Sequence, residues 1–100
     1  MKVRICARLP EATLQALQDL HPDRPTTSLI EDGLEHLLRD LHHDIYPAEF
    51  VATLSQRDPL RTPRRAVNLR LNKQYVDYIR LNVFNLTTCI TTALKLYILP

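Results

Sequence analysis

The sequence predicts a mainly α-helical fold that contains a two-stranded antiparallel β-ribbon. Three observations lead to this fold class. Two segments of the 100-residue chain alternate apolar and polar side chains, which is the period of a half-buried strand. Each segment is followed by two helical patterns with helix-breaking residues between them. The same order of patterns recurs in both halves of the chain, so the sequence indicates an internal repeat.

The two predicted strands cover residues 2–9, KVRICARL, and residues 64–71, RRAVNLRL. One face of each strand is apolar and is expected in the core: Val3, Ile5, Ala7, Leu9, Val67, Leu69 and Leu71. The other face is mostly cationic or polar: Lys2, Arg4, Cys6, Arg8, Arg64, Ala66, Asn68 and Arg70. Pairing of the two strands would gather this second set on one outer surface of the ribbon.

A first helix is predicted after each strand, over residues 10–20 and 73–83, because apolar side chains recur there every three or four positions. Pro10 and Glu11 favour the start of the first of these helices, and Asn72 is a good N-cap for the second. Prolines and hydroxyl side chains follow in HPDRPTTS, and FNLTT is a shorter version of the same signal. Both segments are expected to place capping residues before a second helix.

The strands and first helices of the two copies align at an offset of 62 residues, and the second helices align at an offset of 60. Gly33 and Ala93 occupy equivalent positions, and their small size predicts a close approach of the second helices. One copy alone has unpaired strand edges and too little core, so we expect both copies to share one core. The predicted organisation is a first copy at 1–40, a connector at 41–63 and a second copy at 64–100.

The connector contains three prolines and several polar residues. It predicts one short helix near residues 48–54. Four apolar or aromatic side chains are expected to hold the connector against the core: Ile45, Tyr46, Phe50 and Leu54.

The net charge of +2 is small, so the placement of the cations must indicate which partner they suit. A two-stranded ribbon fits the major groove of B-DNA, where arginine donates two hydrogen bonds to guanine and asparagine pairs with adenine. Cations on an exposed strand also prevent edge-to-edge aggregation, and a surface face is often simply solvated. Because both strands carry the same outer chemistry and lead into the same helix pair, the DNA-binding interpretation is favoured.

The pattern resembles the ribbon-helix-helix superfamily of transcription factors, the group that contains the Arc and MetJ repressors. The segments that carry the resemblance are the strands VRICARLP and VNLRLN and the helix starts TTSLIEDGL and LTTCITTAL. Most family members supply one copy per chain and dimerise. The resemblance therefore implies a tandem ribbon-helix-helix pseudo-dimer, as in the tandem members that assist conjugative plasmid transfer.

The resemblance also implies the site residues. The residues expected to contact bases are Arg4, Cys6, Arg8, Ala66, Asn68 and Arg70. The residues expected to contact DNA phosphates are Lys2, Thr26, Thr27, Ser28, Arg64, Thr87 and Thr88. Cys6 and Ala66 form weak hydrogen bonds or none, so either they contact thymine methyl groups or the sequence specificity is modest.

The expected function is sequence-specific binding of double-stranded DNA, as a transcriptional repressor or as an accessory factor of a plasmid, phage or mobile element. Chains are expected to bind side by side on longer operators, because one pseudo-dimer buries little surface. The alternatives are a protein-interaction module such as an antitoxin, which would use the connector at 41–63 to contact a protein partner, and a fold used only for assembly.

No catalytic set is recognisable, so neither enzymatic activity nor a cofactor is expected. His36, His42 and His43 have no metal-ligand spacing and fit a solvated helix end. Cys6 and Cys89 are expected to be free thiols, with Cys89 packed in a helix interface. The basic strand takes the place of an apolar leader, and the uncharged stretch at 81–94 is too short to span a bilayer. A cytoplasmic, nucleoid-associated protein is the expectation.

Overall fold

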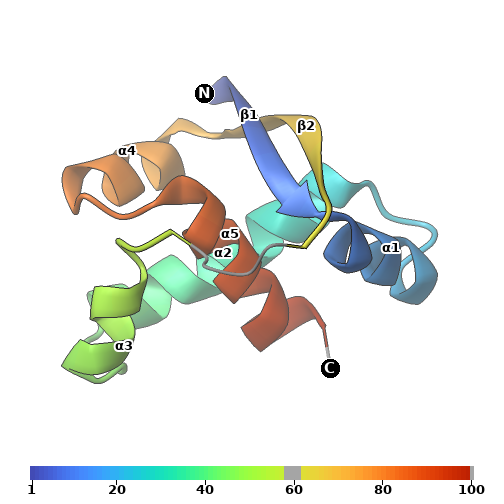
Figure 1. Cartoon of the computed structure of the whole chain (residues 1–100). Coiled ribbons are helices and arrows are strands. Elements are labelled where there is room, and N and C mark those ends of the chain that lie inside the picture. Colours follow the sequence, from blue (N-terminus) through green and yellow to red (C-terminus); the bar gives the residue numbers. More distant parts are fainter. Residues whose placement is uncertain (58–61, 100) are drawn as a thin grey trace.

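Figure 1 shows the computed structural model of the chain, which describes residues 1–57 and 62–99. The elements in chain order are β1 (Lys2–Pro10), α1 (Glu11–Leu20), α2 (Thr26–His42), α3 (Ala48–Thr53), β2 (Arg64–Asn72), α4 (Lys73–Leu81), α5 (Leu86–Ala93) and the π-helical segment η1 (Leu94–Ile98). The predicted class, a mainly helical fold with a two-stranded antiparallel sheet, is confirmed. The parts of the predicted connector and second copy at 58–61 and 100 lie outside the described residues.

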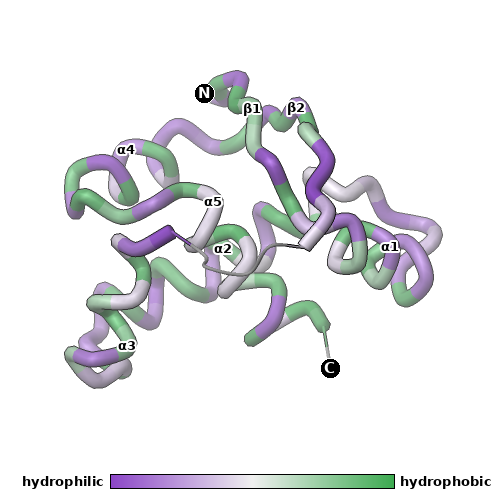
Figure 2. The backbone as a smooth tube through the Cα atoms, viewed as in Figure 1, coloured by the Kyte–Doolittle hydropathy of each residue, from purple (hydrophilic) through white to green (hydrophobic). Residues whose placement is uncertain are grey.

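Strands β1 and β2 pair antiparallel along their whole length. Cys6 lies opposite Asn68 at the centre of the register, and the last pair at one end is Pro10 with Arg64. Apolar residues recur at every second position from Val3 to Leu9 in β1 and from Val67 to Leu71 in β2 (Figure 2), so one face of the ribbon is mainly apolar and the other is mainly polar. The predicted strand pairing is therefore confirmed.

The core lies against the apolar face of the ribbon, where α2 and α5 pack on each other (Figure 1). The strands contribute five buried side chains to this core: Ile5, Ala7, Leu9, Leu69 and Leu71. The first helices add Leu14 and Leu17 from α1 and Val76 and Ile79 from α4. Helices α1 and α4 lie on opposite sides of the ribbon (Figure 1). Apolar side chains from both helices nevertheless belong to the same core cluster, which therefore contains residues of both halves of the chain.

Gly33 of α2 lies directly against Ala93 of α5. A Cβ atom at Gly33 would lie 3.3 Å from the carbonyl carbon and 3.3 Å from the carbonyl oxygen of Ala93. The two helices can approach this closely because neither position carries a bulky side chain. The predicted contact between the two small residues is confirmed.

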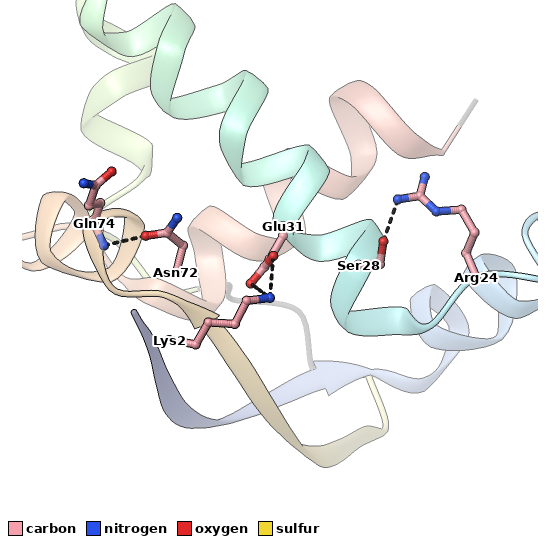
Figure 3. Close-up of polar contacts among 6 residues, drawn as sticks. All are labelled: Lys2, Arg24, Ser28, Glu31, Asn72 and Gln74. Atoms are coloured by element: carbon pink, nitrogen blue, oxygen red, sulfur yellow. Dashed lines mark hydrogen bonds and ion pairs between the residues drawn. The ribbon is translucent and has the colours of Figure 1, made fainter.

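The helix starts match the prediction only in part. The side chain of Asn72 caps α4 by accepting a hydrogen bond from Gln74 N, as expected (Figure 3). The capping residue expected in FNLTT is confirmed, whereas the side-chain cap expected in HPDRPTTS is absent. Helix α2 follows Pro25 without a side-chain cap, and the cap of α5 is Asn85, whose side chain accepts from Thr88 N. Pro25 and Asn85 are the extended residues before the two helices, so the hydroxyl residues of both segments fall within the first helical turn.

Helices α2 and α4 end in the same C-terminal motif. After α4, Val83 has a φ of 60° and its N–H bonds Arg80 O, while Phe84 N bonds Ile79 O. This pair of bonds is the Schellman motif. It ends α4 at Leu81 rather than at the predicted residue 83, because the left-handed residue breaks the helical path.

The connector forms a short helix, as predicted, and α3 covers Ala48–Thr53. Leu54 is fully buried, and Tyr46 and Phe50 pack against the core with their ring centroids 4.4 Å apart. The expected anchoring role of Ile45 is wrong, because its side chain is 61% exposed. Ile45 follows Asp44, whose left-handed conformation ends the helical path of α2.

Candidate nucleic-acid interface

The outer face of the ribbon carries all six side chains that were predicted to contact bases. Each of them is exposed: Arg4, Cys6, Arg8, Ala66, Asn68 and Arg70. Apart from the exposed Arg65, their strand neighbours are apolar and are buried in the core or packed against it, and this fixes which face turns outward. A shift of the register by one residue would bury these side chains and expose the apolar ones, so the alternation of the sequence holds the face in place.

Arginines lie at both ends of this outer face. Arg4 is directly opposite Arg70, whereas Arg8 is opposite Ala66. Like charges placed directly across a strand pair repel each other. Arg4 and Arg70 also line a shallow surface hollow of about 390 Å³ together with Asn68 and Leu69. This half of the ribbon therefore presents hydrogen-bond donors and positive charge that suit an anionic ligand.

The terminal cations of the ribbon, Lys2 and Arg64, make contacts within the protein. The Lys2 ammonium lies 3.0 Å from a carboxylate oxygen of Glu31 on α2 (Figure 3). Arg64 donates from Nη1 to the carbonyl oxygen of Arg8 at 3.0 Å. The Lys2 side chain still has 55% of its surface exposed, so the ion pair leaves part of it open to a ligand.

The hydroxyl residues at the starts of α2 and α5 are partly buried: Thr26, Thr27, Ser28, Thr87 and Thr88. The structure already engages two of these hydroxyls. Ser28 Oγ accepts a hydrogen bond from Arg24 Nη2 at 2.6 Å (Figure 3), and Thr88 Oγ1 donates to the carbonyl oxygen of Gln56 at 2.6 Å. Both contacts tie a helix start to the loop segment that lies beside it.

A hollow of about 430 Å³ joins the ribbon to the start of α5. It brings together predicted residues of three elements with two residues that were not predicted as site residues: Cys6, Arg8, Arg57, Arg64, Asn85, Thr87 and Thr88. The two additions are Asn85, the N-cap of α5, and Arg57, which comes from the connector. The sequence carries no signal for Arg57, because a single arginine in an aperiodic segment does not indicate which surface it faces.

Thiols and imidazoles are separate from this interface, apart from Cys6. Cys89 is buried in the core, and burial raises the pKa of its thiol to about 12, so it stays protonated at neutral pH. The predicted packing of Cys89 is confirmed, and both cysteines are free. His36 stacks on Tyr97 with a centroid distance of 5.4 Å. Within residues 1–57 and 62–99, no group of three His, Cys, Asp or Glu side chains is placed to hold a metal ion.

Comparison of the chain with protein-family models, with curated proteins and with solved structures finds no match. Among the helices of the described ranges, none has the length and apolar character needed to cross a membrane.

Proposed function

We propose that this chain is a tandem ribbon-helix-helix protein that binds double-stranded DNA by inserting the β1–β2 ribbon into the major groove. Its role would be that of a transcriptional repressor or of an accessory factor on a plasmid, phage or other mobile element. The observation that carries the proposal is the exposed outer face of the paired strands, which presents Arg4, Arg8, Asn68 and Arg70.

The strand register supports a relation between the two copies by an approximate twofold axis. An axis between Cys6 and Asn68 exchanges Arg8 with Arg70, which are 62 residues apart and take equivalent places in the register. The hydrogen bonds at the ribbon ends follow the same relation. Glu11 N donates to Pro63 O at 3.0 Å, and Lys73 N donates to Met1 O at 2.9 Å.

The helix contact supports the same relation. Gly33 and Ala93 are equivalent residues of the two copies, and they touch each other where α2 and α5 meet. A contact between equivalent residues is expected on a twofold axis. One chain would then take the place that a dimer takes in most members of the superfamily.

The proposed mechanism has two parts. Arg4, Arg8 and Arg70 donate paired hydrogen bonds to guanine edges, and Asn68 bonds adenine. Cations beside the ribbon and hydroxyls at the helix starts contact the flanking phosphates, which fix the position of the protein on the duplex. Because Arg4 corresponds to Ala66, the two halves of the ribbon present different chemistry, and the preferred DNA site is expected to be non-palindromic.

Selection of bound sequences from a random duplex library, followed by anisotropy titrations, tests this function. Arg8→Ala and Arg70→Ala should each weaken binding to the selected site by about 1–3 kcal/mol and relax the base preference at one position. Arg80→Ala, which removes an exposed arginine of α4, serves as the matched control and should leave the affinity unchanged. Unchanged affinity and base preference in both ribbon variants would refute the proposed base contacts.

Salt dependence separates DNA binding from the alternative functions. Binding through several phosphates weakens steeply as the salt concentration rises. A wild-type chain that shows no affinity for duplex DNA at low salt would overturn the proposal and would leave a protein-interaction or assembly function.

A further inference from the structure

The two helix starts beside the ribbon differ in charge, although they occupy equivalent places in the two copies. At the offset of 60 residues, the acidic residues of α2 correspond to neutral or basic residues of the second copy. Glu31 corresponds to Thr91, Asp32 to Thr92 and Glu35 to Lys95. A carboxylate repels a phosphate, so the two sides cannot attract a DNA backbone equally.

On the α2 side, the neighbouring cations are held by these acids. Lys2 lies 3.0 Å from Glu31, and Arg24 lies 2.5 Å from Asp32. Arg24 also bonds the hydroxyl of Ser28, one of the residues expected to contact phosphate (Figure 3). A phosphate that approached this helix start would have to compete with two carboxylates for the same cations.

On the α5 side, two adjoining surface hollows share Arg57 and Thr88. One is the hollow of about 430 Å³ that Arg8 and Arg64 also line. The other has a volume of about 290 Å³ and is also lined by Lys95. None of the described residues that line either hollow is acidic. We call this region the α5 basic surface and define it by Arg57, Thr88 and Lys95.

We propose that the α5 basic surface binds the DNA backbone on one flank of the site, that Arg57 of the connector is a phosphate-binding residue of this surface, and that the α2 side contributes little. This inference rests on the proposed DNA-binding function and adds the position and one-sidedness of the backbone contacts. Arginine suits the role because its planar guanidinium group donates two parallel hydrogen bonds to phosphate oxygens. The Gln56 carbonyl oxygen accepts from the Thr88 hydroxyl, and this contact fixes the connector next to Arg57 against α5.

Arg57→Gln is the direct test, and Arg24→Gln on the α2 side is its matched control. Arg57→Gln should weaken binding about tenfold for selected and unrelated duplexes alike. The plot of the logarithm of the binding constant against the logarithm of the salt concentration should become less steep by about one unit of slope. Arg24→Gln should change the affinity by less than about twofold, because its charge is already paired with Asp32. Arg57→Lys keeps the charge but not the two parallel donors, so it should restore the salt dependence of the wild type and only part of its affinity. Thermal unfolding followed by circular dichroism would verify that every variant folds.

Neutral methylphosphonate linkages placed on either flank of the selected site test the one-sidedness. With wild-type protein, neutral linkages should weaken binding when they are placed on one flank but not on the other. Arg57→Gln should reduce this effect on the sensitive flank. Equal losses on both flanks, or equal effects of Arg57→Gln and Arg24→Gln, would overturn this inference. If wild type and Arg57→Gln bind DNA with the same salt slope, the inference alone fails. If the wild type binds no duplex, the proposed function fails with it.

Discussion

Val83 has a conformation that a β-branched side chain adopts only with strain. Its φ is 60°, and it occupies the position of a Schellman motif where glycine is usual. The side chain is 79% exposed, so little packing offsets the strain. Val83→Gly should therefore raise the free energy of unfolding by about 1 kcal/mol, measured by urea denaturation.

Asp44 provides the control for this prediction, because it takes the same position after α2 with a φ of 54°. Aspartate tolerates the left-handed region better than valine does, so Asp44→Gly should gain less stability. If Val83→Gly destabilised the protein, or if both variants gained equally, the strain assigned to the valine would be wrong.

Individual residues could be predicted where a periodic pattern fixes their direction. The exposure of Arg4, Arg8 and Arg70 follows from the alternation of the strands, and the cap at Asn72 follows from its place before a helix. Arg57 could not be predicted in the same way, because its neighbours have no period. Its position at the α5 basic surface depends on tertiary packing of the connector.

At the level of the elements, both strands and the first helices were predicted to within two residues, since each combines a clear period with a turn signal. The π-helical segment η1 was not predicted. Leu99 N bonds Leu94 O at 2.7 Å, so the chain widens its turn at the end of the second copy, whereas its apolar spacing resembles that of an α-helix. The closeness of α2 and α5 was predictable because both helices carry a small residue at the equivalent position.

Gly33→Leu tests how strictly the contact between α2 and α5 depends on that small residue. Even a single Cβ atom there lies 3.3 Å from backbone atoms of Ala93, which move only if the helix moves. We expect Gly33→Leu to lower the free energy of unfolding by about 2–3 kcal/mol, although leucine favours helix more than glycine does. Urea denaturation measures this change, and His42→Leu, at an exposed position of the same helix, should shift it by less than about 0.5 kcal/mol. Equal effects of the two variants would contradict a tight helix contact.

In the whole molecule, the strands and helices of both halves bury their apolar side chains in one cluster. The sequence predicted this because neither half has a complete core or a paired strand of its own. It did not predict that the acids of α2 would pair with the cations beside them. Two arginines face each other at one end of the ribbon, whereas an arginine faces Ala66 at the other end, and the ion pairs Lys2–Glu31 and Arg24–Asp32 lie on the α2 side. The molecule is therefore asymmetric in charge, although its elements repeat in order.

Ala66→Arg tests whether this asymmetry determines the shape of the DNA site. Ala66 is exposed and corresponds to Arg4, so the substitution gives both halves of the ribbon an arginine at that position. If the ribbon reads the major groove, sequences selected by Ala66→Arg should become more nearly palindromic than those selected by the wild type. The added cation should also steepen the salt dependence by about one unit of slope, provided that it contacts a phosphate as well as a base. Ala66→Ser is the control, because it changes the same position without adding charge and should select the wild-type site. A palindromic site for the wild type, or an identical site for all three proteins, would show that the outer face of β2 does not determine base preference.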